Sequence, residues 1–461
     1  MAKAIKTTWD LKSLLLSDDD PRIKEKKQAI RDEADQFIEK WQERTDYLEN
    51  PSILKEALDE YETFHRRRYG GGDVGYYFWL RQALDQNDPV IKAYGNQTEE
   101  FVKKISNDTQ FFLLRVAKIK SDEQGKFLAD RELAPYRHFL EQLFVEAKYQ
   151  LSEPEEKIMR LKSTTAHSKW IEMTESFLAK EEREVTTEDG QKEKKTLEGM
   201  KGLLKSKDKK IRDEAAIACN DILSKFAEVA EAEVNAILAD KKIDDELRGF
   251  SRPDEERHLA EDIDSGVVEA MLTAVSSHFA TARQFYRLKA DLLGLPRLAY
   301  HERGLEYGNL DKKYAFAESV ALVDRAFRKL DPEFSKIFQS FLANGQIDVE
   351  PKKGKSGGAF CVHFSLSQPT FVLLNHSEKL RDVLTIAHEM GHALNNELMK
   401  QKQNALNFGT SLSVAEVAST FMEDFALQEV VVDFDEETKL AILMAQLDDS
   451  ISSVYRQVAC Y

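Results

Sequence analysis

Two histidines and a glutamate lie within five consecutive residues, His388-Glu389-Met390-Gly391-His392. On a helix, residues four apart project from nearly the same face, so both imidazoles can reach one zinc ion. Glu389 is offset toward the same side, where it can reach a water molecule on that zinc but not the metal itself. This is the spacing of a zinc peptidase site, and it predicts hydrolysis of a peptide bond with Glu389 as the general base.

A second interpretation is that His388 and His392 occupy a buried helix face and are satisfied by hydrogen bonds. The segment 382–394, DVLTIAHEMGHAL, is compatible with a helix throughout, and its apolar residues would bury that helix. Burying two imidazoles and a carboxylate without partners costs several kcal/mol, so the metal-binding interpretation is favoured.

A catalytic zinc needs a third protein ligand, and Glu416 is the candidate. It lies in a second helical stretch, SVAEVASTFMEDFALQEV at 413–430. Alternatively, Ser413 caps this helix and Glu416 completes a capping box. Glu423, two turns beyond Glu416, either accepts a hydrogen bond from a zinc-binding histidine and fixes its tautomer, or is simply a solvated glutamate.

These residues need elements that position them. Helical periodicity runs from 382 to 400 and again from 413 to about 432, which predicts two helices carrying the metal ligands. Before them, AFCVHF at 359–364 and PTFVLLN at 369–375 predict two short strands.

A basic, glycine-rich loop, PKKGKSGGAFC, occupies residues 351–361. Gly357 and Gly358 predict a place where substrate backbone approaches closely, because glycine leaves the backbone uncovered. The lysines at 352, 353 and 355 predict a solvated basic loop, with attraction of a peptide carboxylate as the alternative.

The rest of the chain predicts a mainly α-helical fold. The chain has only 20 glycines and 10 prolines among 461 residues, so few positions break a helix. The exception is REVTTEDGQKEKKTLE at 183–198, where Asp189-Gly190 is a hairpin turn signal between short alternating arms. We expect two domains: an N-terminal helical domain at 1–200 and a zinc metallopeptidase domain at 201–461, apparently incomplete at its C-terminus.

Composition excludes several classes of protein. With 66 basic and 82 acidic residues the net charge is −16, which argues against a general nucleic-acid binder and against docking on anionic lipid. Three widely spaced cysteines cannot build a disulfide framework. The N-terminus has no signal-peptide core, and no stretch approaches the ~20 apolar residues of a membrane span. We therefore expect a cytoplasmic protein, with its oligomeric state left open.

The sequence resembles the oligoendopeptidase F family of zinc metallopeptidases, relatives of thimet oligopeptidase. The resemblance is strongest around the predicted zinc site, and a looser likeness covers most of the chain. The matching segments are LRD at 380–382, AHEMGHAL at 387–394, EVASTF at 416–421 with Glu423, ISSVYRQ at 451–457, WDL at 9–11 and LKADLLGLP at 288–296.

The resemblance implies an almost wholly helical fold of two lobes around a deep channel, with small β elements near 183–198 and 357–376. It implies oligopeptide substrates cleaved internally, with zinc held by His388, His392 and Glu416, and Glu389 as the base. Segment 369–375, which contains Phe371 and Val372, would be an edge strand that pairs with extended substrate backbone.

Two departures from the family pattern leave alternatives open. Asn395 stands where many relatives carry another histidine, which is not expected to be a ligand. The chain also stops at Tyr461, where relatives continue into a part that carries oxyanion-stabilising residues. A zinc carboxypeptidase or dipeptidyl-carboxypeptidase on a similar fold is one alternative, and a truncated, non-catalytic peptide-binding protein is the other.

Overall fold

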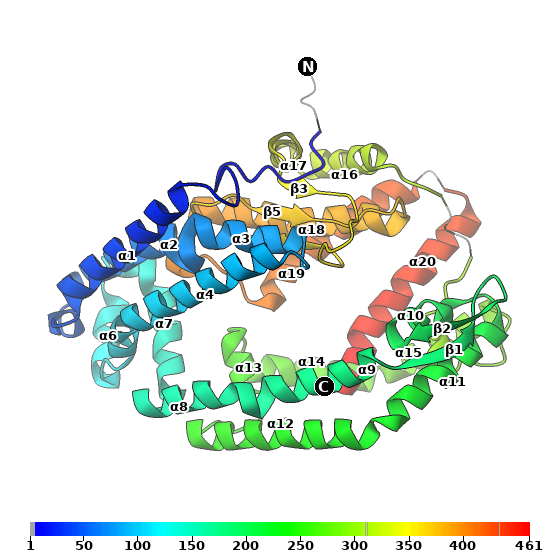
Figure 1. The fold of residues 1–461 in the computed structure, drawn as a ribbon, viewed down its shortest axis with the longest axis horizontal. Coiled ribbons are helices and arrows are strands. Elements are labelled where there is room, and N and C mark those ends of the chain that lie inside the picture. The colour runs from blue at the N-terminus through cyan, green and yellow to red at the C-terminus, as the bar shows by residue number, and fades with distance from the viewer. Residues whose placement is uncertain (1–4, 309, 311, 433) are drawn as a thin grey trace. The chain divides into compact units, whose positions relative to one another are not determined.

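The computed structural model describes residues 5–308, 310, 312–432 and 434–461. The fold is mainly α-helical with two small sheets, as the sequence predicted (Figure 1). It divides into two compact units, each made of two stretches of chain: Met1–Lys148 with Asp311–Asp433, and Tyr149–Leu310 with Phe434–Tyr461. The predicted boundary near residue 200 divides the sequence at a single point into two domains. That division stays a prediction. No helix in the described ranges is both long and apolar enough to cross a membrane.

The first unit carries the helices and the sheet around the predicted metal ligands. Its elements are α1 (Arg22–Trp41), α2 (Pro51–Arg68), α3 (Gly72–Leu84), α4 (Pro89–Thr109), α5 (Phe111–Ala117), α6 (Ser121–Ala129), α7 (Arg137–Glu146), α16 (Phe316–Leu330), α17 (Pro332–Asn344), β3 (Ile347–Asp348), β4 (Phe360–Val362), β5 (Phe371–Leu373), α18 (Leu380–Lys402) and α19 (Leu412–Val431).

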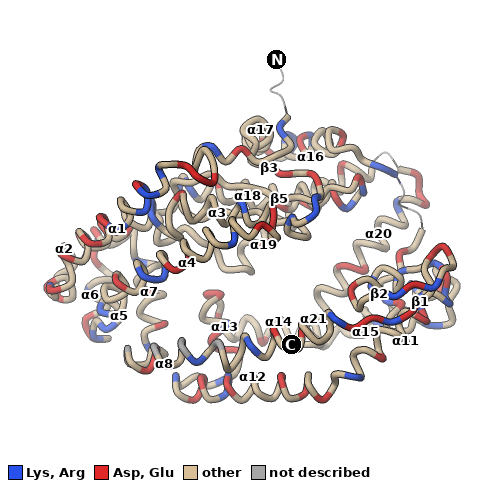
Figure 2. Tube along the Cα trace, in the orientation of Figure 1, with Lys and Arg blue, Asp and Glu red and all other residues tan. Residues whose placement is uncertain are grey.

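The second unit contains the predicted hairpin and most of the remaining helices. Its elements are α8 (Glu153–Ser163), α9 (Lys169–Ala179), β1 (Glu182–Thr186), β2 (Lys192–Thr196), α10 (Leu197–Lys201), α11 (Lys209–Lys225), α12 (Ala227–Arg248), α13 (Glu255–Ala260), α14 (Ser265–Ser277), α15 (Phe279–Leu292), α20 (Glu436–Ile451) and α21 (Gln457–Cys460). The strands β1 and β2 pair antiparallel, and acidic and basic residues are interspersed along them (Figure 2).

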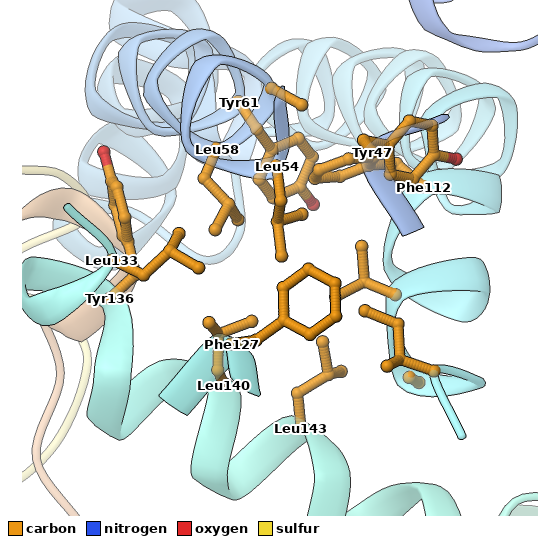
Figure 3. Packing of buried hydrophobic residues seen from close by; sticks show 14 of the residues in the cluster. Tyr47, Leu54, Leu58, Tyr61, Phe112, Phe127, Leu133, Tyr136, Leu140 and Leu143 are labelled. Carbon is orange, nitrogen blue, oxygen red and sulfur yellow. The ribbon is translucent and has the colours of Figure 1, made fainter. Parts of the chain in front are cut away.

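An aromatic core fixes the N-terminal helices of the first unit (Figure 3). Asn50 caps α2 by accepting a hydrogen bond from the Ser52 backbone N–H, and Pro51 occupies the first helical turn. The helix then buries its apolar face against α1, α5 and α7. The fully or nearly fully buried members include Trp41, Tyr47, Leu54, Leu58, Tyr61, Phe112, Phe127, Leu140 and Phe144.

The small sheet of the first unit has the order β3-β5-β4, so β5 is its central strand. Strand β5 pairs parallel with β3 and antiparallel with β4. The prediction that segment 369–375 forms an edge strand is therefore wrong. The physical reason is a parallel partner from residues 347–348, which the sequence did not reveal because two residues carry no strand pattern.

The start of the chain is also attached to this sheet. The Trp9 indole N–H donates to the Val372 carbonyl at 2.8 Å, and the Val349 N–H donates to the Thr7 carbonyl at 3.0 Å. Trp9 also contacts the Phe371 ring, with centroids 5.6 Å apart. The N-terminal segment therefore closes one side of the sheet that borders the predicted site.

Lys355 corrects the prediction of a fully solvated basic loop. Its side chain is 0% exposed and pairs with Asp348 at 2.6 Å, where the Asp348 side chain is 1% exposed. The ammonium also donates to the Glu350 carbonyl at 2.8 Å. Lys352 and Lys353 are exposed, as predicted. The buried pair ties the glycine-rich loop to β3.

Replacing Lys355 by methionine is expected to lower the free energy of unfolding by about 3–5 kcal/mol, because it leaves the Asp348 carboxylate buried without its cation. Urea denaturation followed by circular dichroism measures this. Lys352→Met, in the same loop but exposed, is the matched control and should change stability little. Equal effects from the two variants would contradict the assignment.

His65 predicts a pH dependence of stability. The ring packs between Tyr61 and Tyr69, and burial lowers the pKa of His65 to about 4. Below pH 6.5 the His65 imidazole is protonated in the unfolded chain but stays neutral in the folded chain. The free energy of unfolding therefore falls as the pH drops toward 4, by up to about 3 kcal/mol. Urea midpoints at pH 7 and pH 4.5 should differ more for the native chain than for His65→Phe.

Candidate metal centre

The predicted metal ligands come from two helices that pack directly against each other. Lys379 is the N-cap of helix α18, and its backbone N–H donates to the Asp382 carboxylate at 2.8 Å. The helix carries His388 and His392 one turn apart, with ring centroids separated by 5.0 Å. Helix α19 carries Glu416. It begins at Leu412, so Ser413 lies inside the helix and is not its N-cap, which the structure assigns to Ser411.

Gly391 sets how closely α18 and α19 approach. A Cβ at this position would lie 2.6 Å from the Ala418 carbonyl oxygen and 2.6 Å from the Ser419 Cα, both of which belong to the α19 backbone. Only glycine therefore allows the observed contact between the two helix backbones. This role of Gly391 was not predicted from the sequence. Its only signal was a glycine inside a buried helix.

The three predicted ligands converge on one point. The Nε2 atoms of His388 and His392 lie 3.3 Å and 3.7 Å from the same Glu416 oxygen, Oε2. One donor atom from each residue lies within 4.8 Å of the other two. Ligands of a tetrahedral zinc at about 2.0–2.2 Å lie roughly 3.4 Å apart, so the spacing and the nitrogen–oxygen donor set both fit that metal.

Two further side chains hold the ligands in place. The second ring nitrogen of His388, Nδ1, lies 3.1 Å from the Glu423 carboxylate, and this hydrogen bond is the largest cause that raises the pKa of His388. The buried Ser419 hydroxyl donates to Glu416 Oε2 at 2.7 Å. Of the two interpretations of Glu423, this contact fits the one in which it accepts a hydrogen bond from a predicted zinc-binding histidine. The role of Ser419 was not predicted, although its position one turn after Glu416 is the geometry for such a bond.

Glu389 lies buried beside the ligands, with 7% of its surface exposed. Burial raises the pKa of Glu389 to about 7, the Glu416 charge adds to that, and the Cys361 backbone N–H opposes it. A bound cation would favour the carboxylate form of Glu389. A carboxylate at this position can accept a proton from a nearby water molecule.

The predicted substrate-binding residues divide into two groups. Gly357 and Gly358 are exposed, and a Cβ on either would meet nothing within 4 Å, so space is open beside the backbone. The Gly358 carbonyl is fixed by the Asn375 amide at 2.7 Å. Phe371 and Val372 are 1% and 0% exposed. They lie in the central strand, whose two edges are already paired with β3 and β4, so they cannot pair with substrate backbone.

A second group of possible ligands, Asp213, His301 and Glu302, lies in the other unit. Lys209 pairs with Asp213 at 2.9 Å and Arg212 pairs with Glu302 at 2.8 Å. The side chains of Lys209 and Arg212 therefore neutralise these carboxylates. We interpret the group as an ion-pair network between α11 and the residues around 300.

Replacing Gly391 by alanine is expected to reduce zinc affinity, because the added methyl group must push α19, and Glu416 with it, away from the histidines. Overpacking of this kind typically costs about 1–3 kcal/mol. Zinc content after dialysis against a weak chelator measures the effect. Gly409→Ala, beside which a Cβ meets nothing within 4 Å, is the control. Unchanged zinc affinity in Gly391→Ala would contradict the role of the close helix contact.

Comparison with known proteins agrees with this architecture. The sequence model of peptidase family M3 matches residues 202–460, and a second model, oligopeptidase F, matches residues 116–180. The chain is 24% identical over 418 residues to an oligoendopeptidase F homolog of Borreliella burgdorferi, covering 88% of this chain and 68% of that protein. It is 22% identical over 391 residues to an oligoendopeptidase F homolog of Lactococcus lactis, covering 83% of this chain and 64% of that protein.

The fold is similar to that of a crystal structure of a candidate peptidase from Chlamydophila abortus, with a TM-score of 0.80, 20% identity, and coverage of 98% of this chain and 75% of that one. In this mainly α-helical fold, two histidines and a glutamate on packed helices could hold a metal ion. The sequence model of peptidase family M3 matches more than half of this sequence, so the chain belongs to that family. The chain spans about two thirds of the length of the first curated relatives.

Proposed function

We propose that this chain is a zinc-dependent endopeptidase that hydrolyses internal bonds of short oligopeptides. The observation that carries the proposal is the convergence of His388, His392 and Glu416 beside the buried carboxyl group of Glu389. Family membership supports peptide hydrolysis, and the donor set supports zinc as the metal.

When bound, zinc would lower the pKa of a water molecule and polarise the scissile carbonyl. Glu389 takes the proton of the attacking water and passes it to the leaving amine. Glu423 holds the His388 ring in the tautomer that presents Nε2 toward the metal, and Ser419 orients the Glu416 carboxylate.

We infer that substrate backbone lies along β4, in place of the segment expected from the sequence. In the described residues β4 has a strand partner on one side only. Cys361 of β4 lies opposite Val372, whose N–H points away to the Gln346 carbonyl at 2.8 Å. In an antiparallel pair, opposite residues that do not bond each other turn their N–H groups outward, so the Cys361 N–H faces the open edge of β4. An extended peptide at that edge brings a backbone amide toward the base.

Cleavage of an internally quenched peptide of about ten residues tests the proposal, a length that a strand of ~3.3 Å per residue spans easily. The zinc-treated protein should cleave it, a chelator should abolish cleavage, and added zinc should restore it. Mass analysis of the products separates internal cleavage from removal of C-terminal residues or dipeptides. Zinc binding without cleavage would favour the non-catalytic, peptide-binding alternative.

A further inference from the structure

Trp79 is an exposed aromatic residue on a helix that is mostly buried. Helix α3 packs on one face of the small sheet, and most of its residues, including Tyr76, Tyr77, Phe78 and Leu80, are buried. Trp79 is 41% exposed. Between Asp73 and Arg81 the helix carries no charged residue.

The Trp79 ring is held against two aromatic residues of the β4 strand and the turn after it. Its centroid lies 5.5 Å from that of Phe360 and 5.7 Å from that of Phe364. Phe364 in turn stacks on Tyr76 at 4.6 Å, and the Tyr76 hydroxyl donates to the Val362 carbonyl at 2.8 Å. This aromatic lip, Trp79 with Phe360 and Phe364, is therefore fixed relative to β4.

The two faces of β4 have different surroundings. Phe360 and Val362 point to the α3 face, whereas Cys361 between them lies on the α18 face, where its sulfur is 3.6 Å from the Asn396 amide. A peptide added at the open edge of β4 would lie about 4.8 Å away, and its side chains would alternate between the same two faces. Those on the α3 face would pass beside Trp79.

We propose that the aromatic lip is a specificity subsite that takes one large apolar or aromatic side chain of the peptide. The assignment rests on the proposed function, because it needs substrate backbone along β4. We expect the bound side chain to be uncharged, because the aromatic lip presents ring faces and edges. Helix α3 supplies no carboxylate between Asp73 and Arg81 that would bind a cationic side chain. Trp79 contacts substrate away from the bond that is cut and so sets preference without taking part in the chemistry.

Peptide binding to the zinc-treated Glu389→Gln variant tests this without cleavage. Fluorescence anisotropy is measured for labelled ten-residue peptides that carry one phenylalanine, alanine or arginine at successive positions. At one position, phenylalanine should bind about tenfold or more tighter than alanine, as expected for burial of an aromatic side chain. Adding Trp79→Ala should collapse that preference, and adding Trp79→Phe should keep most of it.

Tyr300→Ala, which removes another exposed aromatic residue, 74% exposed and in the other unit, is the matched control and should leave the preference intact. Peptides that bind with a phenylalanine preference unaltered by Trp79→Ala would overturn the subsite and leave the proposed function standing. A preference for arginine at that position would overturn the apolar assignment. Absence of binding by every peptide would overturn both proposals.

Discussion

Replacing Glu389 by glutamine is expected to lower the rate of peptide hydrolysis by about 10²–10⁴-fold while the protein still folds and binds zinc. Glutamine has nearly the same size and keeps a hydrogen-bonding oxygen, but it cannot take up a proton. Glu389 is buried beside the predicted metal ligands, where a glutamine side chain can occupy the same space.

Three measurements on the same preparation make this result decisive. The rate on a quenched peptide reports hydrolysis, metal analysis reports zinc, and the urea midpoint reports folding. Glu436→Gln is the control, because its carboxylate is 92% exposed on α20 and should affect none of them. A Glu389→Gln variant that cleaves at the native rate would show that another group acts as the base.

Glu416→Gln and Glu423→Gln should weaken zinc binding to different extents. Glu423 contacts His388 but not the metal position, and loss of such a partner typically costs about 10–100-fold in metal affinity. Loss of Glu416 would remove the predicted third ligand and a negative charge next to both imidazoles, so the decrease should exceed that range. Competition with a chromophoric chelator at fixed pH measures both constants.

Which of the two variants loses more zinc affinity decides which glutamate is the third ligand. If Glu423→Gln weakened zinc more than Glu416→Gln, the third ligand would be Glu423 instead. Asp424→Asn, an exposed carboxylate on the same helix that binds Gln428, is the control for loss of charge from α19. It should leave the affinity close to that of the native chain.

The helical part of the site could be predicted because helix geometry is local. The four-residue spacing of His388 and His392 fixes their common face, and the period of 413–430 turns Glu416 and Glu423 to one side of α19. Both predicted helices are present, within a few residues of the expected bounds. The mainly α-helical fold follows from the same local signals.

The small sheet could not be predicted in the same way, because strand order is set by distant partners. A two-residue strand at 347–348 displaces 369–375 from the edge, and Lys355 is buried only because Asp348 and the Glu350 carbonyl receive it. The role of Gly391 likewise depends on the backbone of another helix. Such contacts leave no periodic pattern along the chain.

The bond from the Trp9 indole to the Val372 carbonyl joins residues 363 positions apart. A ribosome makes a chain from its N-terminus, so Trp9 emerges long before the strand that accepts its hydrogen bond. The N-terminal residues must stay unpaired, with apolar side chains exposed, until β5 has been synthesised. The unit that carries the predicted metal ligands is therefore completed only after β5 has been synthesised.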